Sequence, residues 1–201
     1  MSATPSTMLE LGTRVPSFRL KDLSGKPVSS EDVAGASGLL VAFICKHCPF
    51  VQHVRREFAH AAEAFQQRGV AVVAINSNDI ATHPEDGPEG MKEEATAIGY
   101  TFPYLYDDTQ EVAKAFRAAC TPDFFLFDGD QRLVYRGQFD DSRPGSGKPV
   151  TGRDLVAAVD ALLAGTPIAA EQRPSMGCNI KWKKGMEPAY FHGAAQAKLS
   201  S

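Results

Sequence analysis

The sequence lacks an apolar run of ~18 residues, so no transmembrane helix is expected. Its N-terminus also lacks the basic start and the apolar stretch that a secretory signal peptide carries. We therefore expect a cytoplasmic protein with no membrane partner. Only four cysteines are present, and in a reducing compartment they are not expected to form a scaffold of permanent disulfides.

The net charge is small, since 21 Lys and Arg residues face 24 Asp and Glu residues. No broad basic surface is indicated, and nucleic acid is not expected as a partner. At ~150 residues per domain, the 201 residues suffice for one core without disulfides. We predict a single domain over residues 9–165 and a C-terminal extension over residues 166–201, which either packs on the domain or trails from it.

The spacing of apolar residues predicts the elements of the first half. Residues 18–28 alternate apolar and polar, which predicts a hairpin whose second arm Pro27 confines to a sheet edge. Continuous apolar runs predict buried strands over 39–44 and 70–75. Between them, apolar residues recur every three or four positions, which predicts a helix. Strands joined in this way are expected to be parallel.

The second half predicts short helices followed by a hairpin and a last helix. The hairpin has arms over 124–127 and 133–135, and the helix begins at Thr151 and ends at Gly165. Residues from Thr166 onward have few periodic apolar positions and predict an irregular tail. Together, the elements predict an α/β fold with a mixed central sheet and helices on both faces.

The segment Cys45-Lys-His-Cys48-Pro49 lies where the first buried strand meets the helix. A helix N-terminus favours a thiolate, and two sulfurs three residues apart on a helical turn lie within disulfide reach. The pattern favours redox chemistry by a reversible Cys45–Cys48 disulfide. A zinc half-site and two ordinary buried thiols remain as alternatives, although no second Cys-x-x-Cys pair is present.

These residues resemble the thioredoxin superfamily, which combines a Cys-x-x-Cys pair with a later Thr-Pro pair, here Thr121-Pro122. The segment Leu11-Gly-Thr-Arg-Val-Pro-Ser-Phe-Arg-Leu-Lys-Asp22 is similar to the entry of the redoxin branch, which includes the AhpC/TSA peroxiredoxins and the TlpA-like thiol reductases. Three further segments resemble a peroxiredoxin-like family: Cys-Lys-His-Cys-Pro-Phe, Cys120-Thr-Pro-Asp-Phe-Phe-Leu-Phe127 and Gly177-Cys-Asn-Ile-Lys-Trp-Lys183. The resemblance implies a thioredoxin fold and a thiol–disulfide oxidoreductase.

The resemblance also implies roles for individual residues. Cys45 is expected to be an exposed nucleophile that forms a mixed disulfide, and Cys48 a buried resolving partner. Pro122 is expected to be a cis-proline that, with Thr121, presents a backbone edge to an incoming peptide. The implied partners are a disulfide-bearing protein or a small thiol or peroxide, together with a reductant. No organic cofactor and no metal are implied, because the two thiols carry the electrons.

Two departures from the family pattern bear on the reaction. Peroxiredoxins carry Thr or Ser three residues before the reactive cysteine, whereas Ala42 stands before Cys45, and Cys45 itself stands before Cys48. A thiol peroxidase is therefore the rival activity rather than the expected one. Thioredoxins carry a buried acid six residues before the first cysteine, where this chain has Leu39, so a proton acceptor must come from elsewhere.

His47 occupies the position before the second cysteine, where a partly positive imidazole is expected to stabilise a Cys45 thiolate. A solvated histidine without a role is the alternative. Cys120 and Cys178 are candidate additional redox thiols, and two unpaired thiols are the alternative for them. The sequence indicates no oligomeric state.

A metal-binding module is a second rival to the oxidoreductase. Its ligands would be Cys45, Cys48 and either His47 or His53, and the soft thiolates would suit Cu(I).

Overall fold

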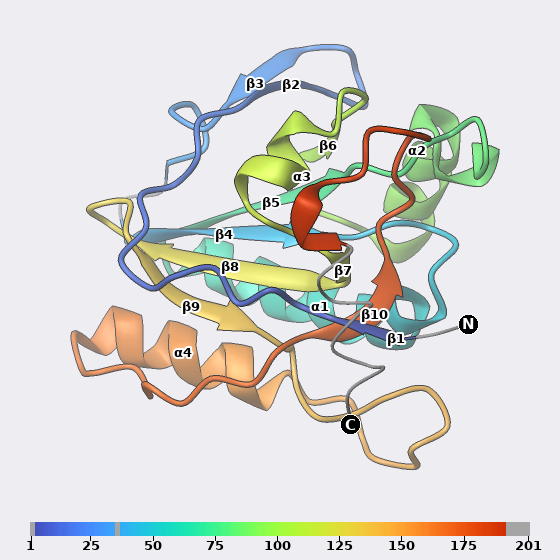
Figure 1. Ribbon diagram of the computed structural model, residues 1–201. Coiled ribbons are helices and arrows are strands. Elements are labelled where there is room, and N and C mark those ends of the chain that lie inside the picture. The colour runs from blue at the N-terminus through green and yellow to red at the C-terminus, as the bar shows by residue number, and fades with distance from the viewer. Residues whose placement is uncertain (1–2, 35–36, 192–201) are drawn as a thin grey trace.

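The computed structural model describes residues 3–34 and 37–191, and its centre is a mixed seven-stranded sheet of order β3-β2-β6-β5-β4-β8-β9 (Figure 1). The strands of this sheet are β2 (Arg19–Asp22), β3 (Pro27–Ser29), β4 (Gly38–Phe43), β5 (Val70–Asn76), β6 (Tyr104–Tyr106), β8 (Asp123–Asp128) and β9 (Leu133–Gly137). The helices are α1 (Pro49–Gln67), the 3₁₀ turn η1 (Pro84–Asp86), α2 (Pro88–Ile98), α3 (Glu111–Ala115) and α4 (Arg153–Ala164). A mixed α/β sheet is therefore confirmed.

The strand pairings around β4 also agree with the prediction. β4 pairs parallel with β5, to which α1 connects it, and antiparallel with β8, while β8 and β9 form the expected hairpin. Pro27 lies in β3, at the edge of the sheet, where its missing N–H leaves no ladder hydrogen bond unmade. Strand β6 was not predicted, because three residues are too few to show a period.

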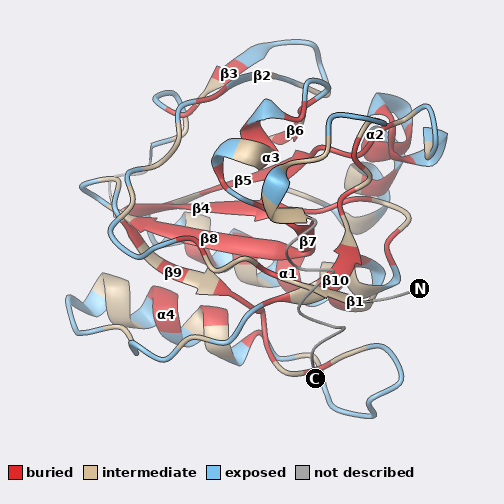
Figure 2. Ribbon diagram, in the orientation of Figure 1, coloured by how far each residue is buried: buried red, intermediate tan, exposed pale blue. Residues whose placement is uncertain are grey.

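Helices cover both faces of the sheet because the side chains of a strand point to opposite faces in turn. Leu40 and Ala42 of β4 belong to the apolar cluster that includes α1, α2 and α4. Leu39, Val41 and Phe43 belong to the cluster on the other face, with α3. All six residues of β4 are buried, which explains their continuous apolar run (Figure 2).

The C-terminal extension differs from the predicted irregular tail. It contains β10 (Met176–Asn179), which lies between β1 (Ala3–Pro5) and β7 (Cys120–Thr121) in a second, three-stranded sheet. Ile180 and Trp182, just beyond this strand, pack into the apolar cluster on the α3 face. The period of a four-residue strand is too short to recognise, and its partners lie far away in the sequence. Among the described residues, no helix combines the length and apolarity needed to cross a membrane.

A candidate redox site at the start of α1

Cys45 and Cys48 lie at the junction between β4 and α1, as the sequence predicted. Cys48 is the N-cap of α1 and Pro49 is its first helical residue, where the missing proline N–H costs nothing. The chain therefore turns from strand to helix at the Cys-x-x-Cys motif. The predicted exposure of Cys45 is wrong, however, since both cysteines have 0% exposed surface.

The Thr121–Pro122 segment brings a second part of the chain against the two sulfurs. The Thr121–Pro122 peptide bond is cis, as the resemblance implied. The Thr121 hydroxyl oxygen lies 3.3 Å from the Cys45 sulfur, and the Cys48 thiol donates to the Thr121 carbonyl at 3.2 Å. The expected site residues of both segments are thus in direct contact.

The surroundings of the two sulfurs shift their pKa values in opposite directions. The side-chain hydrogen bonds from Cys178 and from Cys45, together with the backbone N–H of Val51 in the first turn of α1, lower the pKa of Cys48. Burial and the hydrogen bond with Cys48 raise the pKa of Cys45, and the charge of Asp86 raises it further. More donors thus converge on the sulfur at the helix N-cap than on Cys45, and the Cys45 thiolate stays a prediction.

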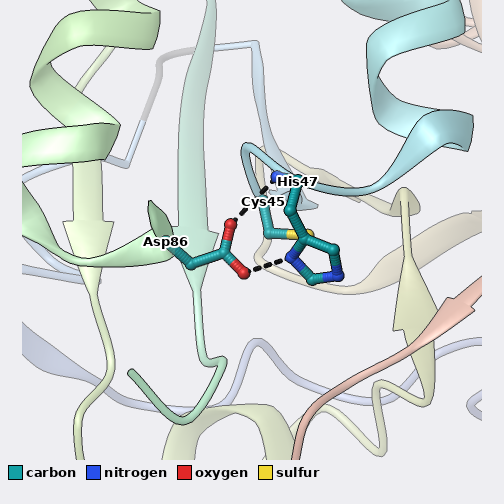
Figure 3. Close-up of side chains that lie close together, drawn as sticks. All are labelled: Cys45, His47 and Asp86. Atoms are coloured by element: carbon teal, nitrogen blue, oxygen red, sulfur yellow. Dashed lines mark hydrogen bonds and ion pairs between the residues drawn. The ribbon is translucent and has the colours of Figure 1, made fainter. Parts of the chain in front are cut away.

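His47 lies beside Cys45 but faces a carboxylate (Figure 3). Its Nδ1 is 3.8 Å from the Cys45 sulfur and hydrogen-bonds with Asp86 Oδ2, while its backbone N–H donates to Asp86 Oδ1 at 3.0 Å. The negative charge of Asp86 thus offsets the effect that a positive charge on His47 would have on the Cys45 sulfur. The second ring nitrogen, Nε2, is buried without a hydrogen-bond partner.

Asp86 is the functional residue that the sequence analysis missed. It lies in η1 with 0% exposed surface, and the Asn78 side chain also donates to its Oδ2 at 2.8 Å. Burial acts to raise the pKa of Asp86, but the hydrogen bonds from His47 and Asn78 outweigh burial, and the pKa is lowered. An acid in a polar loop 39 residues from its partner gives no sequence signal. The His47–Asp86 pair is thus the candidate for the proton acceptor, whose usual position is taken by Leu39.

Cys45, His47 and Asp86 also form a possible metal site, since one ligand atom from each lies within 4.8 Å of the others. A thiolate, an imidazole and a carboxylate suit zinc better than Cu(I). The predicted alternative ligand His53 is not part of this group, and its Nε2 hydrogen-bonds with the Ser142 hydroxyl at 2.7 Å.

The two additional cysteines have different surroundings. Cys178 lies in β10, and its side chain hydrogen-bonds with that of Cys48. Cys120 lies in β7, where its thiol donates to the Pro122 carbonyl at 3.8 Å, and burial raises its pKa. The structure thus groups Cys178, but not Cys120, with the sulfurs of the Cys-x-x-Cys pair.

A mixed sheet with a dithiol at a helix N-terminus, facing a cis-proline, defines a thioredoxin-fold oxidoreductase. The AhpC/TSA family model matches residues 11–136, well over half of the chain, and the chain belongs to this family.

Comparison with individual proteins agrees with this assignment. The crystal structure of an uncharacterized conserved protein from Geobacillus kaustophilus has 54% sequence identity and a TM-score of 0.90, covering 92% of this chain and 98% of that one. Thiol-disulfide oxidoreductase ResA of Bacillus anthracis is 25% identical over 134 residues, which is 63% of this chain and 68% of ResA. Chloroplastic peroxiredoxin Q of Arabidopsis thaliana is 28% identical over 139 residues, 64% of this chain and 60% of that protein.

Proposed function

We propose that this chain reduces disulfides of other proteins by thiol–disulfide exchange at Cys48 and Cys45. The observation that carries the proposal is that both sulfurs, at the N-terminus of α1, contact Thr121 of the cis-proline segment, Cys45 at 3.3 Å and Cys48 at 3.2 Å. A dithiol in this position is poised both to attack a disulfide and to close into one. Similarity to ResA supports the same reaction class.

Cys48 makes the first attack in this scheme, since a thiolate is the nucleophilic form of cysteine. The Cys48 thiolate attacks one sulfur of the substrate disulfide, which forms a mixed disulfide and releases the other substrate sulfur as a thiolate. Cys45 then loses its proton and attacks the Cys48 sulfur. The products are a Cys45–Cys48 disulfide and the second substrate thiolate, so the substrate gains two electrons and the pair loses two. A dithiol reductant restores the pair.

His47 and Asp86 take part in the second step, when Cys45 must lose its proton. His47 Nδ1 lies 3.8 Å from the Cys45 sulfur and donates to Asp86, so it does not accept the proton itself. The Asp86 carboxylate, within 4.8 Å of the same sulfur, is the base of the pair. We propose that the pair acts as the proton acceptor of the resolving thiol. A reducing, cytoplasmic compartment would keep the four cysteines as the thiols seen here.

The test is reduction of insulin disulfides by dithiothreitol, with and without the protein. Wild type is expected to accelerate the reaction, and Cys48→Ser and Cys45→Ser to lose the acceleration. Cys120→Ser is the matched control, because it removes a buried thiol that donates to the Pro122 carbonyl, and it should retain the activity. Retention of activity in Cys48→Ser would overturn the proposal.

A thiol peroxidase is the second candidate, and one observation favours it. Peroxiredoxins have a hydroxyl side chain three residues before the reactive cysteine, where this chain has Ala42. The hydroxyl of Thr121 takes a similar place, because its Oγ1 lies 3.3 Å from the Cys45 sulfur. In this reaction a peroxide would oxidise a thiolate to a sulfenic acid, which would condense with the other thiol to give a disulfide and water. Stopped-flow mixing with hydrogen peroxide measures this activity. A rapid reaction that Cys45→Ser and Thr121→Val both lose would favour the peroxidase.

A further inference from the structure

Strand β10 of the C-terminal extension occupies the backbone edge of the cis-proline segment. It pairs antiparallel with β7, so that Cys178 lies opposite Thr121 and Asn179 opposite Cys120. The fit is close, since a Cβ at Gly177 would lie 1.9 Å from the Thr121 carbonyl oxygen. This is the edge at which an external peptide is expected to pair, so the extension lies where a substrate would lie (Figure 1).

The pairing also brings a third sulfur to the dithiol. Thr121 contacts the Cys45 sulfur through its hydroxyl and the Cys48 sulfur through its carbonyl, and Cys178 is its partner across the ladder. Cys178 is 3% exposed and its thiol hydrogen-bonds with Cys48. Cys48 therefore has one thiol partner from its own motif and a second from the extension.

We propose that Cys178 is a third redox cysteine, held by β10 in the position of a substrate cysteine and able to form a disulfide with Cys48. This inference rests on the proposed function only in that thiol–disulfide exchange produces the Cys45–Cys48 disulfide on which Cys178 acts.

The exchange needs no additional oxidant. The Cys178 thiol loses its proton and attacks the Cys48 sulfur of the Cys45–Cys48 disulfide, whose S–S bond breaks. A Cys48–Cys178 disulfide forms, and Cys45 leaves as a thiolate that takes up one proton, which balances the proton that Cys178 releases. One disulfide and one thiol are present before and after the step, so no electrons are gained or lost.

The same sulfur can also release a substrate. When Cys48 carries a substrate in a mixed disulfide, either Cys45 or Cys178 can attack the Cys48 sulfur and free the substrate thiol. Because β10 covers this edge, an external peptide must displace the strand before it pairs with Thr121. Cys178 therefore competes with external substrates for Cys48.

Disulfide mapping of the wild type is the first test. The reduced protein is oxidised with diamide, alkylated and digested with trypsin, which cleaves after Lys46 and so separates Cys45 from Cys48. A Cys45–Cys48 disulfide joins residues 22–46 to residues 47–55, whereas a Cys48–Cys178 disulfide joins residues 47–55 to residues 154–181. We expect both species in wild type and only the second in Cys45→Ser. Absence of the second species from both proteins would overturn the proposal.

The second test uses glutathione disulfide as the probe and follows the mass of the protein. Cys45→Ser is expected to lose glutathione from Cys48 as the Cys48–Cys178 disulfide forms. The double variant Cys45→Ser/Cys178→Ser should retain glutathione about tenfold longer, since an intramolecular thiol attacks faster than one in solution. Cys45→Ser/Cys120→Ser is the matched control and should behave like Cys45→Ser. Equal retention in all three variants would overturn the role of Cys178.

The two proposals fail in different ways. If Cys48 takes up no glutathione in any variant, the proposed function is wrong, while diamide mapping still decides whether Cys178 pairs with Cys48. Gly177→Ala addresses the covering strand separately, because the added Cβ cannot be placed against Thr121. We expect Cys48 in reduced Gly177→Ala to react with iodoacetamide several times faster than in wild type. An unchanged rate would show that β10 does not limit access to Cys48.

Discussion

Two pairs of buried residues, each with one cysteine and one aspartate, differ in the direction of their pKa shifts. In the first pair, the pKa of the Cys48 thiol and that of the Asp86 carboxyl are lowered. In the second pair, which flanks Thr121 and Pro122 in the sequence, burial raises the pKa of Cys120 and that of Asp123, the latter to about 8. All four residues have 0% exposed surface, so the exposed fraction does not distinguish the two pairs.

The pKa shifts differ because the hydrogen-bond partners of the four side chains differ, not because the side chains are buried to different extents. Cys48 hydrogen-bonds with two thiols and with a helix N–H, and Asp86 hydrogen-bonds with the imidazole of His47. Asp123 receives only neutral donors such as the Ser6 hydroxyl, at 3.0 Å, and its Oδ1 has no partner. Burial alone disfavours a charge, and only donors or an opposite charge restore it. Cys48 and Asp86 have such partners and belong to the candidate redox site, whereas the partners of Cys120 and Asp123 do not outweigh burial.

Replacing Cys48 tests this comparison with the largest expected effect. Reduced wild type should show one thiolate by ultraviolet absorbance at neutral pH, and Cys48→Ala should lose both this thiolate and disulfide-exchange activity, the latter by about three orders of magnitude. Cys120→Ala is the control from the second pair and should keep both signals. Thiolate absorbance that survives in Cys48→Ala would place the charge on another sulfur and break the comparison.

Replacing Asp86 is expected to lower stability. The folded-state pKa of this carboxyl is lowered, so its contribution to stability is present at neutral pH and is lost in acid, as pH falls through the folded-state value. Asp86→Asn should reduce the free energy of unfolding at pH 7 by about 3 kcal/mol, because His47 loses a buried partner. Urea unfolding at pH 7 measures the change, and the exposed acid Asp160 provides a control variant, Asp160→Asn. If Asp86→Asn and Asp160→Asn lowered the free energy of unfolding equally, the stabilising contact between Asp86 and His47 would be contradicted.

Replacing Asp123 should change stability in the opposite direction. With a folded-state pKa of about 8 against 3.8 for the unfolded chain, the folded state keeps a proton that the unfolded state has lost between these values. The free energy of unfolding of wild type therefore falls as pH rises through this window, by at most about 1.4 kcal/mol per pH unit.

Asp123→Asn removes this dependence and should be more stable than wild type at pH 8 by about 1–2 kcal/mol. Parallel urea titrations at pH 5 and pH 8 give the slope. A stability of Asp123→Asn that falls with pH as steeply as that of wild type would assign the slope to other groups.

Lys46 is expected to have the smallest effect, although it lies between the two cysteines. Its ammonium pairs with Glu93 at 2.5 Å, and the two side chains are 30% and 73% exposed. An exposed ion pair of this kind contributes about 0.5 kcal/mol or less, and its field is screened by water. Lys46→Ala should leave the redox potential within about 10 mV of wild type, measured by equilibration with glutathione. A larger shift would show that Lys46 contributes to the field at the sulfurs.

Much of the fold was accessible from local pattern. The apolar runs of β4 and β5, the three-to-four spacing of α1 and the hairpin of β8 and β9 all depend on neighbours within one element. The Cys-x-x-Cys motif at the strand–helix junction is equally local. Strands β6, β7 and β10 were not predicted, because each is held mainly by partners distant in the sequence.

The roles within the site were less accessible than its residues. The sequence indicated Cys45, Cys48, His47, Thr121 and Pro122, and the structure brings these residues together. It did not indicate that Cys45 is buried or that hydrogen-bond donors converge on Cys48. Both follow from groups that only folding brings to the sulfurs, among them Asp86 and Cys178.

Residue pattern along the chain was enough to predict the fold class, the dithiol at a helix N-terminus and the family to which that dithiol belongs. These properties depend on residue spacing over one strand and one helical turn. Only the folded chain shows which groups surround each sulfur, that Asp86 lies against His47 and that β10 covers the site. Those properties depend on hydrogen bonds and charges across 39 to 76 residues of chain between partners, and on a strand of the extension paired with Thr121. Spacing along the chain does not encode such contacts, because they arise only when distant segments pack against each other.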